Sequence, residues 1–317
     1  MTAPSQHGGP TRYRVSSLGS LDDSHSTRVA HFGVLGNSGC QVKIKQHDGN
    51  IVITKSALDV RYNQRLKLQV EKQRAFGAAN TLPFIRVPRI IAEFEQQGLY
   101  GVEMEYVNFH DSLAFFSAAS PASVDRVASM LFDYVDRQIT SAEMLELPIA
   151  ILRDKVGSVV RALDSAGSHD IYRPSVTKVM RAIDARHTVQ IPVGSCHGDL
   201  TFSNILIAPD AGAVALLDFL DSYIESPAID IAKLRQDTRF HWTLLMSDKI
   251  SDQIRFKQVM QYFDQRICDR YSTAVWYRSN IDLILGVNML RIAPYARTPA
   301  VQQFLVSCID ALRFTDD

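Results

Sequence analysis

Three side chains that could bind a metal ion or move a proton lie in one short segment of the chain. They are Asp199, Asn204 and Asp218. Between Asn204 and Asp218, the sequence "PDAG" at 209–212 is a turn signal flanked by two apolar runs. A hairpin centred on this turn would place residue 204 opposite residue 217, and thus bring Asn204 next to Asp218. Converging carboxylate and amide oxygens suit a hard cation such as Mg²⁺ that also binds phosphate. Ordinary loop chemistry is the alternative, because Asp and Asn are common in turns.

A second group of residues, nearer the start of the chain, could bind phosphate. The sequence "GNSGC" at 36–40 separates two predicted strands, and its backbone N–H groups and the Ser38 hydroxyl can approach phosphate oxygens closely. Lys55 lies at the end of the following hairpin and could reach those phosphates, and Glu71 on the next predicted helix could hold Lys55 in place. The alternatives are a plain hairpin turn, a solvated edge-strand lysine, and a surface pair of Glu71 with Lys67.

The elements that must position these residues change in type along the chain. Strand patterns predominate up to residue 107, with turn signals at Asp48-Gly49 and Gln97-Gly98 and one helix that stops near Gly77. From residue 108 onwards, helical periodicity predominates. It occurs at 120–139, 149–167, 175–187 and again over 227–317. We therefore predict an α+β chain with a flexible tail (1–26), a strand-rich N-terminal lobe (27–107) and a helical C-terminal lobe (108–317).

Composition excludes several classes of protein. The 317 residues are 46% hydrophobic and 21% charged, and 34 basic residues balance 34 acidic ones. This balance indicates neither a nucleic-acid partner nor an anionic membrane surface. The four cysteines form no C-x-x-C pair, which favours reduced, mostly buried thiols. No apolar run approaches the roughly 20 residues that span a bilayer, and the polar N-terminus lacks the features of a signal peptide. We expect a cytoplasmic protein without a membrane span.

Three motifs together resemble a known family. The segment "HGDLTFSN" at 197–204 resembles the H-G-D-x-x-x-x-N catalytic loop of the aminoglycoside phosphotransferase and choline kinase family, whose members are related to protein kinases. The segment "LLDFLD" at 216–221 resembles the metal-binding D-F-G-like segment, and "VITKSA" at 52–57 resembles the strand that carries the V-A-I-K lysine. The resemblance covers most of residues 30–235. It implies a bilobal protein-kinase-like fold, with a small strand-rich N-lobe and a larger helical C-lobe.

The resemblance also implies a role for each matching residue of the catalytic segment. Asp199 would orient the acceptor hydroxyl and take its proton, while Asn204 and Asp218 would hold Mg²⁺. His197 would shape the catalytic loop. Asp230, in "SPAIDIAKL", would anchor that loop from the next helix.

The N-terminal lobe would bind the nucleotide, which is ATP or another NTP. Lys55, paired with Glu71, would bind the α- and β-phosphates. The glycine-rich loop would cover the nucleotide through Gly36, Asn37, Ser38 and Gly39. The backbone of the linker "EMEYV" would hydrogen-bond the adenine at Glu105, Tyr106 and Val107.

Departures from the protein-kinase pattern favour a small-molecule acceptor. Gly198 stands where protein kinases carry Arg, Leu220 stands where they carry Gly, and no A-P-E segment follows. Polycationic aminoglycosides need many carboxylates, yet the residues after Asp218 are mixed in sign, with Lys233 and Arg235 among the acids. This mixture favours a neutral or anionic acceptor such as a carbohydrate.

We therefore predict an ATP- and Mg²⁺-dependent phosphotransferase that transfers the γ-phosphoryl group to a hydroxyl of a small molecule. A sugar or other carbohydrate is favoured over an aminoglycoside or choline. One alternative is an atypical protein kinase. The other is a nucleotide-binding pseudokinase that acts as an interaction module, although the chain retains the four central groups Lys55, Asp199, Asn204 and Asp218.

Overall fold

The computed structural model describes residues 34–35, 39–47, 50–247 and 252–314. The predicted tail, three residues of the glycine-rich loop (Gly36, Asn37 and Ser38) and the Asp48-Gly49 turn lie outside these residues. The chain forms two compact units. The first unit comprises Met1–Lys67, Arg89–Tyr106 and Ser247–Ile250, and the second comprises Leu68–Pro88, Val107–Met246 and Ser251–Asp317. Leu68–Pro88 therefore belongs to the helical unit, whereas the sequence predicted it to be part of the strand-rich lobe.

The first unit is built on an antiparallel sheet with the strand order β1-β2-β3-β6-β5. Its strands are β1 (Val34–Leu35), β2 (Cys40–His47), β3 (Asn50–Ala57), β5 (Ile90–Gln96) and β6 (Leu99–Glu105). The turn predicted at Gln97-Gly98 joins β5 to β6, and both residues have positive φ, 54° and 75°. Positive φ at both central residues is what a tight hairpin turn requires. After β3 come a short 3₁₀ turn (Val60–Tyr62) and helix α1 (Asn63–Ala79), whose residues from Leu68 onwards belong to the second unit.

The second unit contains two small sheets. The four-stranded sheet has the order β4-β11-β10-β7, and its strands are β4 (Ile85–Arg86), β7 (His110–Asp111), β10 (Ile205–Ile207) and β11 (Val214–Leu216). The other sheet pairs β8 (Glu143–Pro148) with β9 (Thr188–Val193). Sequence patterns did not indicate β8 and β9, because each is short and finds its partner only across two intervening helices.

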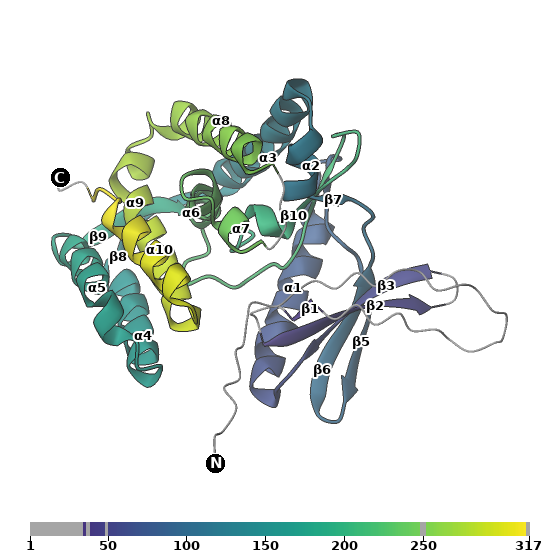
Figure 1. Ribbon diagram of the computed structural model, residues 1–317, viewed down its shortest axis with the longest axis horizontal. Helices are drawn as coiled ribbons and strands as arrows, with labels where there is room; N and C mark the ends of the chain where they lie inside the picture. The colour runs from purple at the N-terminus through teal and green to yellow at the C-terminus, as the bar shows by residue number, and fades with distance from the viewer. Residues whose placement is uncertain (1–33, 36–38, 48–49, 248–251, 315–317) are drawn as a thin grey trace, which may run out of the picture. The chain divides into compact units, whose positions relative to one another are not determined.

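Helices form most of the second unit, as predicted (Figure 1). They are α2 (Ser112–Ala118), α3 (Pro121–Ser141), α4 (Ala150–Ser165), α5 (His169–Asp184), α6 (Pro227–Thr238), α7 (Trp242–Leu245), α8 (Gln253–Tyr271), α9 (Val275–Ile292) and α10 (Pro299–Asp310), with 3₁₀ turns at Phe202–Asn204 and Ala293–Tyr295. The prediction for α5 was too short, because the helix continues through Pro174 and begins at His169. Proline is unfavourable inside a helix, so the pattern placed the start after it.

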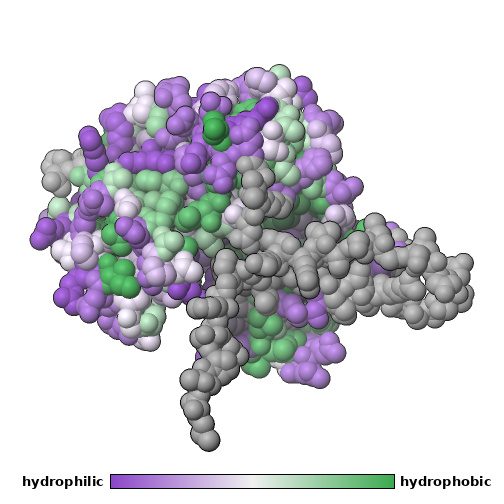
Figure 2. Space-filling model, in the orientation of Figure 1, coloured by the Kyte–Doolittle hydropathy of each residue, from purple (hydrophilic) through white to green (hydrophobic). Residues whose placement is uncertain are grey.

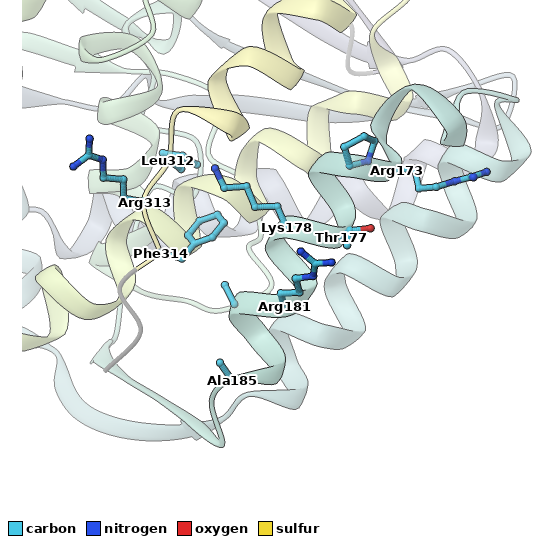
Figure 3. A pocket seen from close by; sticks show the side chains of 10 residues that line it. Arg173, Thr177, Lys178, Arg181, Ala185, Leu312, Arg313 and Phe314 are labelled. Atoms are coloured by element: carbon cyan, nitrogen blue, oxygen red, sulfur yellow. The ribbon is translucent and has the colours of Figure 1, made fainter.

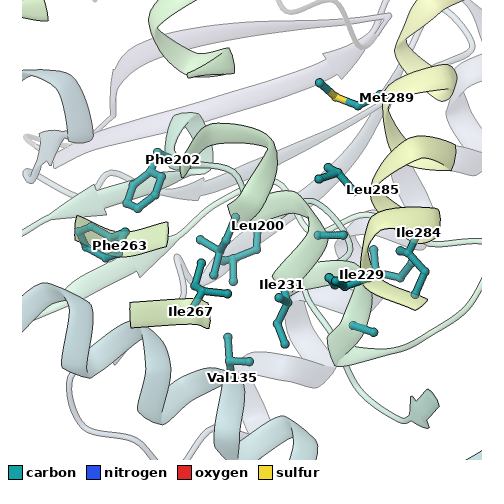
Figure 4. Close-up of a cluster of buried hydrophobic side chains, with 14 of the residues drawn as sticks. Val135, Leu200, Phe202, Ile229, Ile231, Phe263, Ile267, Ile284, Leu285 and Met289 are labelled. Atoms are coloured by element: carbon teal, nitrogen blue, oxygen red, sulfur yellow. The ribbon is translucent and has the colours of Figure 1, made fainter. Parts of the chain in front are cut away.

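Helix α6 lies at the centre of the core of the second unit. A Ser-Pro pair starts it: the Ser226 side chain accepts a hydrogen bond from the backbone N–H of Ala228, and Pro227 takes the first helical position. Every residue of α6 is buried. Figure 4 shows Ile229 and Ile231 of α6 among apolar side chains of α3, α8 and α9. Six of the buried residues are polar or charged, and each therefore needs a partner inside the protein. They are Asp230, Lys233, Arg235, Gln236, Asp237 and Thr238.

Hydrophilic and hydrophobic residues are interspersed over the face of the second unit that Figure 2 shows. Some large apolar side chains are exposed, including Ile254 of α8 and Val275 of α9. In the described part of the chain, no helix is both long and apolar enough to cross a membrane.

Removing the Ile231 side chain should test the central place of α6. Ile231 is fully buried, so Ile231→Ala leaves a cavity and should lower the free energy of unfolding by about 2–5 kcal/mol. Ile254→Ala is the matched control, because the Ile254 side chain is 73% exposed on α8, and it should change stability by less than about 0.5 kcal/mol. Urea unfolding followed by circular dichroism measures both, and equal effects would contradict the central position of α6.

Candidate active site

The hairpin predicted at the "PDAG" turn forms in the expected register. Strands β10 and β11 pair antiparallel with Ile205 opposite Leu216. The next pair outwards is Asn204 and Leu217, and the Leu217 N–H donates to the Asn204 carbonyl oxygen at 2.9 Å. The backbone prediction is confirmed: Asn204 and Asp218 adjoin each other at the open end of the hairpin.

Asn204 also contacts Asp199, the third member of the predicted group. Its amide nitrogen Nδ2 donates to the backbone oxygen of Asp199 at 2.9 Å and to the carboxylate Oδ2 at 3.0 Å. Because Nδ2 is used in this way, the amide oxygen Oδ1 is the atom left to bind a cation. Asp218 is exposed and has a φ of 59°, an uncommon left-handed conformation that Asp tolerates better than most residues.

Lys233 of α6 is the closest charged partner of Asp199. Its ammonium Nζ lies 2.9 Å from Asp199 Oδ1, and the lysine is 7% exposed. Burial alone would raise the pKa of Asp199, but the charge and hydrogen bond of Lys233 outweigh burial and hold that pKa below its ordinary value. Asp199 is therefore ionised at neutral pH and held in one orientation. In the sequence, Lys233 is recognisable only as a basic residue among acids, since its approach to Asp199 depends on the packing of α6.

Two aspartates of α6 hold the backbone of the same loop. Asp230 accepts hydrogen bonds from the backbone N–H groups of His197 (2.7 Å) and Gly198 (2.8 Å). Asp237 accepts from the N–H of Phe202 at 2.6 Å, and its other oxygen accepts from Thr243. Burial raises the pKa of both aspartates to about 6, although these backbone N–H groups oppose the rise. Together with Lys233, α6 fixes the loop at three points.

His197 is enclosed within this loop. Its ring lies 4.4 Å from the Phe219 ring, centre to centre, and its Nδ1 accepts a hydrogen bond from the Asp199 N–H at 3.2 Å. Burial lowers the pKa of His197 to about 4, although the nearby carboxylates of Asp199 and Asp218 oppose this. A neutral, packed imidazole of this kind supports the shape of the loop and does not transfer protons at neutral pH.

The two departures from the protein-kinase pattern, Gly198 and Leu220, are physically coupled. Gly198 has a φ of 86°, and a Cβ atom there would overlap the carbonyl group of Leu220. The Leu220 N–H in turn donates to the carbonyl oxygen of His197 at 3.0 Å. The segment after Asp218 therefore lies against the catalytic loop at a position where only glycine leaves room.

Lys72 of α1 binds the same Leu220 carbonyl group. Its Nζ donates to the Leu220 carbonyl oxygen at 2.7 Å and to Glu225 Oε2 at 2.6 Å. Glu225 also accepts from the Ser222 N–H and from the thiol of Cys196. Lys72 thus holds the backbone just after Asp218. The role of Lys72 was not predicted, because its contacts with Leu220 and Glu225 join parts of the chain about 150 residues apart.

The residues predicted to bind the nucleotide occupy the following places. Lys55 lies on β3, between β2 and β6, and is 4% exposed, so it is not a solvated edge-strand lysine. Glu71 is exposed on α1. Of the glycine-rich loop, only Gly39 is described. It has a φ of 70°, and a Cβ atom added at this position would clash with the ring of Tyr62.

The predicted linker begins at the end of β6. Glu105 is the last residue of β6, and its N–H donates to the carbonyl oxygen of Arg89 at 2.9 Å. Tyr106 follows and is half-buried, while Val107 is buried in the second unit. The pairing of Lys55 with Glu71 and the nucleotide contacts of these residues remain predictions.

The ligand atoms near the hairpin suit Mg²⁺ bound together with phosphate. Asp218 supplies a carboxylate and Asn204 an amide oxygen, and both are at least partly accessible. Across the described residues, no three His, Cys, Asp or Glu side chains cluster in a way that would hold a metal by themselves. Mg²⁺ commonly takes only one or two protein carboxylates and completes its coordination with water and substrate phosphates. The donor set therefore fits a magnesium–phosphate site.

A cavity of about 920 Å³ lies elsewhere in the second unit, between α5 and residues 312–314. Figure 3 shows its lining, where Lys178 lies beside Phe314 with its ammonium 5.7 Å from the ring centre. Lys178 is already paired with Asp310. None of the predicted site residues lines this cavity, so the candidate active site is defined by side-chain chemistry and not by this pocket.

The contact between Gly198 and Leu220 makes a testable claim. Gly198→Ala adds both a positive-φ penalty and a clash with a backbone carbonyl. Gly167→Ala is the matched control, since Gly167 has a φ of 64° but no atom within 4 Å of the added Cβ. Gly167→Ala should cost about 1–2 kcal/mol, and Gly198→Ala a further 1–3 kcal/mol or so from overpacking. Urea unfolding measures the free energy of unfolding of both variants. Equal losses of stability would contradict a clash between the added Cβ and the Leu220 carbonyl group.

Comparisons with known proteins agree with this geometry. A family model described as the phosphotransferase enzyme family matches residues 44–249. Among curated protein sequences, none matches the chain. Among solved structures, the chain is similar to a thermostable mutant of aminoglycoside phosphotransferase APH(4)-Ia in ternary complex with AMP-PNP and hygromycin B. The TM-score is 0.62, the identity is 11%, and the match covers 89% of this chain and 92% of that one.

Two further structures show the same fold. Aminoglycoside phosphotransferase APH(3'')-Id from Streptomyces rimosus matches with a TM-score of 0.51 and 18% identity over 83% of this chain and 93% of that one. An aminoglycoside-3'-phosphotransferase of type VIII matches with a TM-score of 0.51 and 16% identity over 81% and 93%. The predicted α+β, protein-kinase-like fold is confirmed. Since the family model covers more than half of the sequence, the chain belongs to the phosphotransferase enzyme family.

Proposed function

We propose that this phosphotransferase transfers the γ-phosphoryl group of ATP, or of another NTP, to a hydroxyl of a small molecule in the presence of Mg²⁺. The observation that carries the proposal is the ionised Asp199 carboxylate, held by Lys233 at 2.9 Å and bonded to Asn204 beside the hairpin end where Asp218 lies. This arrangement joins a proton acceptor to two candidate metal ligands.

Asp199 would orient the acceptor hydroxyl and accept its proton as the bond to phosphorus forms. The pKa of Asp199 lies below its ordinary value, so the group is a weak base whose main contribution is positioning. Positioning and charge neutralisation account for most of the catalysis in phosphoryl transfer. Lys233 keeps the carboxylate ionised and directs its second oxygen towards Asn204.

Asn204 Oδ1 and the Asp218 carboxylate would hold Mg²⁺, which when bound neutralises charge on the phosphates. Lys55 on β3 would bind the α- and β-phosphates, with Glu71 as its proposed partner. The glycine-rich loop that includes Gly39 would cover the nucleotide. The backbone of the 105–107 linker would hydrogen-bond the base.

The charges around the catalytic loop support a neutral or anionic acceptor such as a carbohydrate. The acids that follow Asp218 are largely committed to internal partners, since Asp230 and Asp237 bond backbone N–H groups and Glu225 binds Lys72. These three acids are therefore not free to bind a polycation. The neighbour that binds hygromycin B shares only 11% identity with this chain, so its acceptor does not transfer to this protein.

Two other functions have distinct signatures. An atypical protein kinase would label proteins in a mixed pool, whereas our proposal expects labelled small molecules only. A pseudokinase would bind nucleotide without turnover. A screen of small hydroxyl compounds and of a mixed protein pool with ATP and Mg²⁺, read by mass spectrometry for one added phosphoryl group, together with a nucleotide-binding measurement, separates all three.

Asp199→Asn should remove the proton acceptor while preserving shape. We expect phosphotransfer to fall by at least about 100-fold, within the range for general-base catalysis. Asp210→Asn is the matched control, because Asp210 lies in the exposed hairpin turn and its side chain accepts a hydrogen bond from the Gly212 N–H, which Asn can also accept. Full activity in Asp199→Asn would remove Asp199 from the mechanism.

Lys233→Met should change the pH dependence of the reaction. Without the ammonium, nothing offsets the burial of Asp199 as strongly, and the pKa of Asp199 should rise. Activity that needs the carboxylate is lost as pH falls through this pKa, so the acidic limb of kcat/KM should move to higher pH. Lys178→Met, which alters a lysine paired with Asp310, should leave the limb in place. An unshifted limb in Lys233→Met would contradict the assigned role.

A further inference from the structure

Arg291, near the end of α9, differs from Arg235 and Arg239 in that no ion pair neutralises it within the described residues. On α6, Arg235 contacts Asp264 and Asp282 at 3.3 Å, and just beyond the helix Arg239 contacts Asp282 at 3.1 Å. Among the described residues, Arg291 has no carboxylate within ion-pair distance. The residue is partly exposed. Within the described residues it is therefore a partly exposed arginine that forms no ion pair.

Two neutral groups hold this guanidinium in place. It lies over the Tyr223 ring, 5.3 Å from the ring centre, and its Nη1 donates to Asn288 Oδ1 at 3.3 Å. Such stacking orients an arginine without neutralising it. Because a guanidinium carries five N–H donors, most of them remain for another acceptor.

The surroundings of Arg291 are rich in donors. Asn288 is fully buried, and because its oxygen faces Arg291, its Nδ2 faces away and has no partner within the described part of the chain. The same holds for the hydroxyl of Tyr223. Burial raises the pKa of Tyr223, so the hydroxyl keeps its proton. Neither neighbour brings a negative charge to the guanidinium.

Arg291 lies near the catalytic loop. Tyr223 belongs to the segment after Asp218. A hydrogen bond from the Leu220 N–H to the carbonyl oxygen of His197, at 3.0 Å, joins this segment to the loop. Helix α9 packs along α6, and Figure 4 shows Leu285 and Met289 of α9 in the same cluster as Leu200 of the loop. The charge of Arg291 is also among the influences that lower the pKa of Asp199.

We propose that Arg291 binds an anionic substituent of the acceptor, a carboxylate or a phosphate, while an acceptor hydroxyl faces Asp199. This inference rests on the proposed function and narrows its acceptor class to acidic carbohydrates such as sugar acids or sugar phosphates. The planar fork of a guanidinium matches either anion with two parallel hydrogen bonds. An amino sugar would place a cation against Arg291 and is disfavoured.

Matched sugars test the charge requirement directly. Glucose, glucosamine, glucuronate and glucose 6-phosphate, with the corresponding galactose and mannose compounds, present similar hydroxyls and different charges. Isothermal titration with AMP-PNP and Mg²⁺ present measures binding, and mass spectrometry with ATP measures transfer. We expect wild type to prefer one anionic class, carboxylate or phosphate, over the neutral sugar by about 10- to 100-fold.

Variants of Arg291 separate specific recognition from structural damage. Arg291→Gln should abolish the preference for the acid while leaving binding of the neutral sugar unchanged, and Arg291→Lys should restore part of it. Arg297→Gln, which removes an exposed arginine of the following segment, should keep the wild-type preference. A structural defect would weaken acids and neutral sugars alike.

The two proposals fail in different ways. Arg291-dependent binding of acids without any transfer would overturn the proposed function and leave the anion site standing. Transfer to neutral sugars with no effect of Arg291→Gln would support the phosphotransferase and overturn the anion site. Acids that bind wild type no better than neutral sugars would also overturn it.

Discussion

Charged side chains on a fully buried helix hold the catalytic loop in place, and the rest of the site depends on this interaction. Ions and polar groups inside a protein need partners, and α6 finds several of them in the loop. Asp230 accepts hydrogen bonds from the N–H groups of His197 and Gly198, and Asp237 accepts one from the N–H of Phe202. Lys233 forms an ion pair with Asp199. The need to satisfy buried charges therefore also determines the shape of the loop.

This way of fixing the loop has a cost in stability. The pKa of Asp230 and of Asp237 is raised to about 6 by burial, against an ordinary value of 3.8. A carboxyl with a raised pKa stabilises the folded state fully below pH 3.8, and this contribution is lost as pH rises through 6. At neutral pH both groups are ionised in the core, where they hold the loop through their hydrogen bonds. The pKa of Asp199 is lowered instead, because the charge of Lys233 outweighs the effect of burial.

The same distribution of charge bears on the choice of acceptor. Acids near the loop are used inside the protein, and the basic residues Lys72 and Lys233 are paired. Within the described residues, the partners of Arg291 are the Tyr223 ring and the Asn288 amide. The aminoglycoside phosphotransferases of similar fold share only 11% and 18% identity with this chain, so the fold similarity does not assign the acceptor of this enzyme.

Much of the fold and part of the site followed from sequence, because their signals are local. The "PDAG" turn and its apolar flanks determined a register that places Asn204 beside Asp218, and helical periodicity indicated α3 and the helical region that begins with α6. Non-local pairings were not predictable: β8 meets β9 only across two helices, and Pro174 concealed the start of α5. The sequence alone identified the residues that we predict to carry the chemistry. Only the tertiary structure decided that Lys233 orients Asp199 and that Lys72, next to the predicted Glu71, holds the segment after Asp218. These contacts join distant parts of the chain, and the direction of each side chain depends on how its helix packs.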